Sequence, residues 1–80
     1  MDLENLPFII RWHRKKAGLS RDALAKLCNI GKTVIYDIEH GKKTIRMDSL
    51  MKVLHVLNLS LQLEGPLMDK CREELLNETR

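Results

Sequence analysis

Aromatic residues are rare in this chain, which has one Trp, one Tyr and one Phe among its 80 residues. This scarcity argues against an aromatic-rich core and favours a core of aliphatic side chains carried by helices. Cysteine is scarce too: Cys28 and Cys71 show no metal-type spacing, and Cys28 belongs to an apolar pattern described below. We therefore expect two reduced thiols in a cytoplasmic protein, and no metal site.

Long apolar runs are missing as well, since no stretch approaches the length of a membrane span. Asp2 and Glu4 interrupt any signal-peptide pattern. The chain also lacks a nucleophile–base set and a phosphate-binding loop, so we expect neither an enzyme nor a cofactor nor a small-molecule substrate. A chain this short buries only about 60% of its unfolded surface, and a second copy that covers more apolar area would stabilise it.

The middle of the chain carries an excess of positive charge. Residues 11–52 contain 11 Lys or Arg against 4 Asp or Glu, a net charge of +7, whereas acidic ends bring the whole chain to +3. A basic centre suits a polyanionic partner, of which DNA is the obvious one. The alternative is a solvated surface that happens to be basic.

The stretch 20–41 reads as two short helices joined by a tight turn. Ser20 is a good N-cap for the first helix, and Gly41 is placed to follow the end of the second. Asn29 falls at the break, where a tight turn needs a left-handed backbone, and Ala25 lies four residues earlier. This spacing is typical of a helix-turn-helix. The apolar positions form two helical sets, Leu24 with Cys28 and Ile35 with Ile38.

Helices are also predicted on both sides of this motif. The first begins at residues 5–7, because Pro is accepted only in a first turn, and it ends at Gly18. A fourth helix has Asp48 or Ser49 in its first turn and then presents a broad apolar face.

After Asn58 the apolar period changes from 3.6 to 2, with Leu59, Leu61 and Leu63 alternating with polar residues. This alternation predicts a half-buried strand. A lone strand on a helical domain has no partner in its own chain, so we expect it to pair with the same strand of a second copy.

The predicted fold is therefore all-α, a compact four- to five-helix bundle with a helix-turn-helix in residues 1–58. Residues 59–64 form a dimerisation strand that pairs across a homodimer. Residues 65–80 form a short amphipathic helix or tail, which either packs on its own dimer or docks on another protein.

The central stretch resembles the helix-turn-helix of the XRE/Cro-repressor family, usually written LSQEELA…G(V/I)S…I…IE.G. The corresponding segments here are LSRDALA, NIGKTVI and IEHG. Arg21 replaces the family's Gln and Asn29 its turn Gly, and both replacements are chemically workable. The segment that follows is similar to HipB-like antitoxins, whose helical domain ends in a short strand. The resemblance covers residues 6–64.

The resemblance places base-reading side chains on the second helix of the motif, at Lys32, Thr33 and Asp37, with Tyr36 on the adjacent exposed edge. Lys donates to guanine N7 and O6, and Thr offers a methyl or hydroxyl group to a base edge. Asp37 would accept from cytosine N4, be neutralised by a neighbouring cation, or remain a solvated carboxylate.

Other positions are expected to contact DNA phosphates or to hold the reading helix in place. By the family's pattern, Arg14 pairs with Glu39 and ties the first helix to the reading helix without touching DNA. The candidates for phosphate contact, including backbone amides at a helix N-terminus, are Arg21, Gly31, Lys42, Lys43 and Arg46.

Three functions remain open at this level. The first is a dimeric repressor of the antitoxin type, which binds a palindromic double-stranded DNA operator near its own promoter, autoregulates its operon and also binds a HipA-like kinase toxin. The second is a stand-alone phage-type repressor without a toxin. The third is a helical protein-interaction module whose basic face has no role with DNA.

Overall fold

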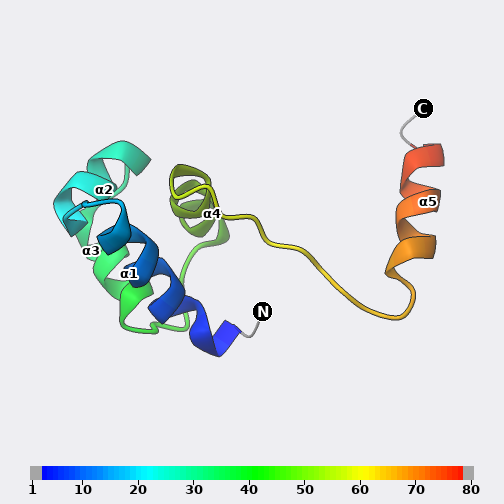
Figure 1. The fold of residues 1–80 in the computed structure, drawn as a ribbon, viewed down its shortest axis with the longest axis horizontal. Helices are drawn as coiled ribbons and strands as arrows, with labels where there is room; N and C mark the ends of the chain where they lie inside the picture. Colours follow the sequence, from blue (N-terminus) through cyan, green and yellow to red (C-terminus); the bar gives the residue numbers. More distant parts are fainter. Residues whose placement is uncertain (1–2, 79–80) are drawn as a thin grey trace.

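The computed structural model describes residues 3–78, and every regular element in that range is helical (Figure 1). Helices α1 to α4 form one body, and α5 stands apart from it at the far end of an extended linker. None of the described helices is long and apolar enough to cross a membrane. The elements are η1 (Leu3–Asn5), α1 (Leu6–Lys16), α2 (Arg21–Cys28), α3 (Lys32–Glu39), α4 (Met47–Val56) and α5 (Met68–Glu78).

Helix α1 begins and ends where the sequence predicts. Asn5 is its N-cap residue, and Pro7 lies in the first turn, where its missing N–H costs no helical hydrogen bond. Gly18 adopts a positive φ of 72° just beyond the helix, and the Leu19 amide donates to the Arg14 carbonyl at 3.1 Å. This left-handed residue satisfies carbonyls at the helix end and turns the chain towards α2.

The turn between α2 and α3 has the predicted geometry. Ser20 Oγ accepts a hydrogen bond from the Ala23 amide at 3.0 Å, which caps α2. Asn29 has φ 55° and ψ 46°, the left-handed conformation that a tight turn requires. The Ile30 amide donates to the Ala25 carbonyl at 3.0 Å and closes the turn.

The exit from α3 and the start of α4 are also set by local chemistry. Gly41 has φ 74° beyond the end of α3, and the Lys42 amide donates to the Asp37 carbonyl at 3.0 Å. At α4 the N-cap residue is Arg46, whose side chain makes no capping bond. Asp48 lies in the first turn, as predicted, and its Oδ1 accepts from the Ser49 amide at 2.8 Å.

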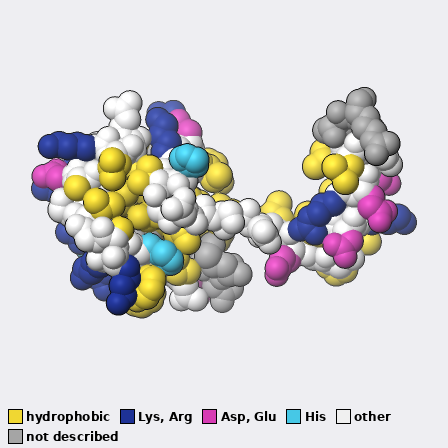
Figure 2. Space-filling view, turned by 45° about the horizontal axis from the view of Figure 1, so that its top comes forward, with side chains coloured by type: hydrophobic (Ala, Val, Ile, Leu, Met, Phe, Trp, Pro, Cys, Tyr) yellow, Lys and Arg dark blue, Asp and Glu magenta, His cyan; other side chains and the backbone are white. Residues whose placement is uncertain are grey.

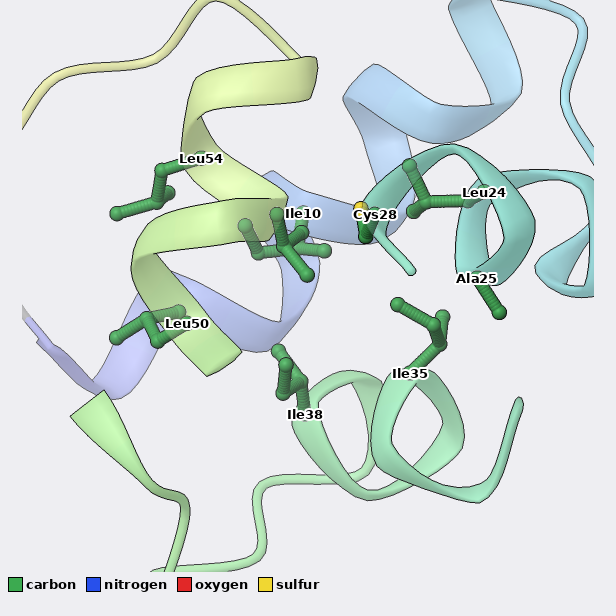
Figure 3. Packing of buried hydrophobic residues seen from close by; sticks show 9 residues of the cluster. Ile10, Leu24, Ala25, Cys28, Ile35, Ile38, Leu50 and Leu54 are labelled. Carbon is green, nitrogen blue, oxygen red and sulfur yellow. The ribbon is translucent and has the colours of Figure 1, made fainter. Parts of the chain in front are cut away.

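The core of the body is aliphatic, as the scarcity of aromatic residues predicts. Figure 3 shows side chains from all four helices converging on one centre, with the Cys28 sulfur among them. Since each helix is too short to be stable alone in water, this shared burial holds α3 in place. The buried residues are Ile10, Leu24, Ala25, Cys28, Ile35, Ile38, Leu50, Val53 and Leu54.

The strand expected in the C-terminal part does not form within a single chain. Residues 59–64 are extended but form no strand, because a strand needs a hydrogen-bonded neighbour and no other extended segment of residues 3–78 pairs with them. Of the alternating leucines only Leu59 packs against the core, while Leu61 and Leu63 are exposed. The bundle contains four helices, as the prediction of four to five allows, and α5 is a fifth helix that lies apart from it.

Candidate nucleic-acid interface

Helix α3 divides its residues between the core and one exposed face. Lys32, Thr33, Tyr36 and Asp37 follow the i, i+1, i+4, i+5 spacing of a single helical face. Three of them are exposed, and the Asp37 side chain retains 26% of its accessible surface. The structure therefore brings the four predicted reading residues together on the side of α3 that faces away from the core.

Lys32 begins this face and is held only loosely. Its Nζ lies 3.8 Å from Asp22 Oδ2, and both side chains are well exposed. Exposed ion pairs of this kind contribute about 0–1 kcal/mol. The ammonium group is therefore easily redirected to a guanine edge or a phosphate.

Asp37 has a cation beside it. Lys42 Nζ lies 3.4 Å from Asp37 Oδ2. Among the three situations considered for this carboxylate, the structure therefore shows the one with a neighbouring cation. Because the two charges offset each other, this pair lowers the repulsion that a lone carboxylate would meet near phosphates.

Tyr36 is oriented by an aromatic stack that the sequence analysis missed. Its ring centroid lies 3.8 Å from that of His40, with an angle of 18° between the planes. His40 Nδ1 lies 2.8 Å from the Tyr36 carbonyl oxygen, which fixes the imidazole over the ring. The Arg21 guanidinium lies over the Tyr36 ring, 5.6 Å from its centroid. The four-residue spacing of Tyr36 and His40 is the one signal in the sequence for this contact.

Below this exposed layer, two arginines share one buried carboxylate. Arg14 donates from Nε to Glu39 Oε2 at 2.6 Å and from Nη2 to Oε1 at 3.0 Å. Arg21 Nε donates to the same Oε1 at 3.2 Å. Arg14 Nη1 also donates to the Leu19 carbonyl at 2.9 Å, so α1, α2 and α3 meet at this cluster.

The charge state of Glu39 follows from these contacts. Burial raises the pKa of its carboxyl group, but hydrogen bonds and positive charge from Arg14 and Arg21 outweigh that effect and leave the pKa below its ordinary value. Glu39 is therefore ionised at neutral pH. A charged Glu39 with two guanidinium partners fixes the angle at which α3 leaves α2.

The candidate phosphate ligands differ in whether they already pair with an acidic side chain. Arg21 is turned towards Glu39, with 34% of its side chain exposed. Arg46 Nη2 lies 3.0 Å from Asp48 Oδ2 in an exposed pair. Lys43 is exposed and has no acidic group within 4 Å among the described residues. Gly31 is the N-cap residue of α3, and nothing lies within 4 Å of the position its Cβ would take, so no side chain crowds Gly31 at this helix N-terminus.

The four-helix body and α5 differ in surface charge. Figure 2 shows Lys and Arg side chains along the outer edge of the four-helix body and several Asp and Glu side chains on α5. Within residues 3–78, no group of three His, Cys, Asp or Glu side chains is placed to hold a metal ion. A basic surface around the exposed face of α3 is an arrangement that a DNA duplex fits.

Comparison with known proteins places this arrangement in a family. The Helix-turn-helix sequence family matches residues 10–63. An uncharacterized HTH-type transcriptional regulator of Sinorhizobium fredii, y4mF, is 33% identical over 58 residues, which cover 72% of this chain and 76% of that protein. Two solved structures, a complex of a HipB variant with an O2 20mer and a HipA-HipB-O2-O3 complex, superpose with a TM-score of 0.72.

Those structures are 23% identical to this chain; the alignments cover 82% of it, with 92% of the first matched chain and 93% of the second. At this identity, the likeness shows a shared fold. The sequence matches, which cover most of the four-helix body, also show the family. The chain belongs to the XRE-type helix-turn-helix family of DNA-binding transcriptional regulators.

Proposed function

We propose that the chain is a sequence-specific transcriptional repressor of the antitoxin type, which acts as a homodimer on a palindromic operator and also binds a HipA-like kinase toxin. The observation that carries the DNA-binding part is the exposed face of α3, where Lys32, Thr33 and Tyr36 stand clear of the core. The Glu39 cluster ties that helix to α1 and α2.

In this proposal α3 enters the major groove and α2 lies across the backbone. Lys32 donates to a guanine edge, Thr33 and Tyr36 contact neighbouring bases, and Asp37 remains paired with Lys42. Phosphates are held by the Gly31 amide region and by the basic side chains that flank α3: Arg21, Lys42, Lys43 and Arg46.

The dimer is proposed to form through residues 59–63. Two α3 helices must lie roughly 34 Å apart to enter successive major grooves of one operator. The Leu59 amide already donates to the Leu54 carbonyl and the Leu63 carbonyl accepts from Arg72, but residues 60–62 have no backbone partner among the described residues. Antiparallel pairing with the same segment of a second copy would supply one.

The antitoxin part is supported by similarity of fold to HipB chains solved in complexes, one of which also contains HipA. Its test is the gene next to this one. If that gene encodes a kinase-like protein, the two should co-purify as a stable complex. A lone gene, or a neighbour that does not bind, leaves a stand-alone repressor.

The DNA-binding part is tested by two lysines with different roles. Lys32→Ala should relax preference at one operator position and cost about 1–3 kcal/mol there, because it removes a base contact. Lys43→Ala should weaken all duplexes alike and reduce the slope of log affinity against log salt by about one, because it removes a phosphate contact. Both are measured by fluorescence anisotropy on operator and random duplexes.

The two variants serve as each other's control, since each removes one exposed ammonium group. Equal losses on operator and random DNA for both would remove Lys32 from the reading role. Binding of the unmodified protein that did not depend on salt would contradict a DNA function and favour a helical interaction module.

A further inference from the structure

Helix α5 carries an apolar face and lies away from the body of its own chain (Figure 1). Leu67 precedes the helix, and Met68, Cys71 and Leu75 continue the face at helical spacing. Leu67 retains 74% of its accessible surface. Asp69 and Glu73 lie on the opposite side, and four Asp or Glu against two Lys or Arg give α5 a net charge of −2. Such a helix is built to lie against another surface.

The four-helix body offers an apolar hollow between η1 and the start of α4. Its volume is ≈ 450 Å³. Leu3 and Met47 at this hollow are 70% and 66% exposed, so the hollow is open to solvent. The apolar lining includes Leu3, Leu6, Ile45, Met47, Leu50 and Leu61.

A second hollow lies beside α5 and shares one residue with the first. It has a volume of ≈ 720 Å³ and lies between residues 61–65 and the α5 side chains Met68, Arg72 and Leu75. Leu61 lines both hollows. Arg72 Nη2 donates to the Leu63 carbonyl at 3.1 Å, so α5 folds back towards the linker instead of continuing outward.

The direction of the linker decides which body α5 meets. The linker leads away from its own body, and α5 lies at its far end (Figure 1). If residues 59–63 pair antiparallel with a second copy, the partner's linker arrives from the opposite direction and brings the partner's body to the end where α5 lies. This step rests on the proposed dimer. Around Leu61, the hollow beside α5 in one copy then faces the hollow on the body of the other.

We infer that α5 of each copy packs its apolar face into the hollow between η1 and α4 of the second copy, so that the dimer is held by two exchanged helices. A two-stranded ribbon alone is only marginally stable in water and needs a helix packed against it. The charges agree with this arrangement, because residues 11–52 carry +7 and α5 carries −2.

Disulfide trapping between full-length chains tests the contact. One chain carries Met68→Cys with Cys71→Ser, and a second chain with a larger tag carries Met47→Cys with Cys71→Ser. Cys28 is 4% exposed and reacts only slowly in the folded chains. After co-refolding and mild oxidation, a disulfide heterodimer should be the main product on a non-reducing gel. In a matched control, Lys26→Cys on α2, outside the hollow, replaces Met47→Cys and should give little of it.

Several outcomes would overturn the inference. Placing Met47→Cys and Met68→Cys in one chain would give a monomeric intrachain disulfide if α5 instead docked on its own body. A disulfide between two Met68→Cys chains would mean that the helices pair with each other. An absence of trapping in a sample that sediments as a dimer would overturn the exchange and leave the 59–63 pairing standing. A sample that sediments as a monomer would remove the proposed dimer itself.

A measurement of affinity complements the trapping. Leu67→Lys charges the apolar face of α5 and should weaken dimerisation about tenfold or more, since it loses the burial of one large side chain. Asn77→Lys adds the same charge on the opposite side of the helix and should leave the dimer almost unchanged. Equal effects of the two substitutions would contradict a specific apolar contact.

Discussion

At the scale of single residues, Glu39 is the buried group that ties α3, with its predicted reading face, to α1 and α2. Its side chain has no accessible surface, and it accepts hydrogen bonds from Arg14 and Arg21. Removing one partner of a buried pair strands the other charge, which typically costs about 3–5 kcal/mol, whereas apolar replacement of both is much less harmful. We expect Arg14→Met or Glu39→Leu alone to cost that much, and the double variant less than either, in urea unfolding. Additive losses would mean that the two side chains do not interact.

The lowered pKa of Glu39 also predicts how stability responds to acid. A carboxyl group whose pKa is lower in the folded than in the unfolded state stabilises the fold above the unfolded pKa, about 4.3 for Glu. That contribution is lost as the pH falls below this value towards the folded pKa. The urea midpoint should therefore drop on acidification below about pH 4.3, and Glu39→Gln should show a shallower drop from a lower starting value. An unchanged acid limb in Glu39→Gln would contradict this assignment.

The sequence could predict part of this residue-level arrangement. The pairing of Arg14 with Glu39 was expected from the family's pattern, and the structure brings the two side chains together. The second hydrogen bond to Glu39, from Arg21, was not expected. Which carboxylate the long Arg21 side chain reaches depends on the angle at which α2 and α3 cross, and the sequence does not give that angle. The stack of Tyr36 on His40 was within reach of sequence reasoning, since it joins residues four apart on one helix.

At the scale of elements, the turn between α2 and α3 depends on the left-handed backbone of Asn29. This conformation costs about 1–2 kcal/mol for an ordinary residue, is tolerated by Asn and is free of strain for Gly. Asn29→Val should therefore lose about 1–2 kcal/mol, and Asn29→Gly should lose little or gain. Chemical denaturation of the two variants measures the difference. Equal stability would mean that the turn does not constrain the backbone.

The ends of the elements were predictable for a physical reason that does not extend to the linker. Ser20, Gly18 and Asn29 act on backbone groups within a few residues, so their chemistry is visible in the sequence. The alternation of Leu59, Leu61 and Leu63 is equally visible, but a strand also needs a partner, and the described part of one chain offers none. Local signals fix helix ends, whereas pairing depends on chain segments that lie far apart or in another molecule.

At the scale of the whole molecule, the proposed repression would depend on two α3 helices held at a fixed distance in a dimer. Leu61→Pro should remove a ladder donor, if the N–H of residue 61 points to the partner, and an apolar side chain from the proposed dimer segment. The variant should sediment as a monomer or a loose dimer and lose operator affinity, while it keeps weak, salt-sensitive binding to random DNA. A tight dimer in this variant would place the interface elsewhere, on α4 or α5.

The buried position of Cys28 gives the molecule a built-in measure of its own opening. Burial raises the pKa of this thiol, partly offset by the charge of Lys52, and its Sγ lies 3.9 Å from the Lys52 carbonyl oxygen between α2 and α4. A thiol reagent reaches it only when these two helices separate, whereas Cys71 is exposed in the single chain. Labelling should therefore proceed in two phases of equal amplitude. The rate of the slow phase, from Cys28, reports how often α2 and α4 separate.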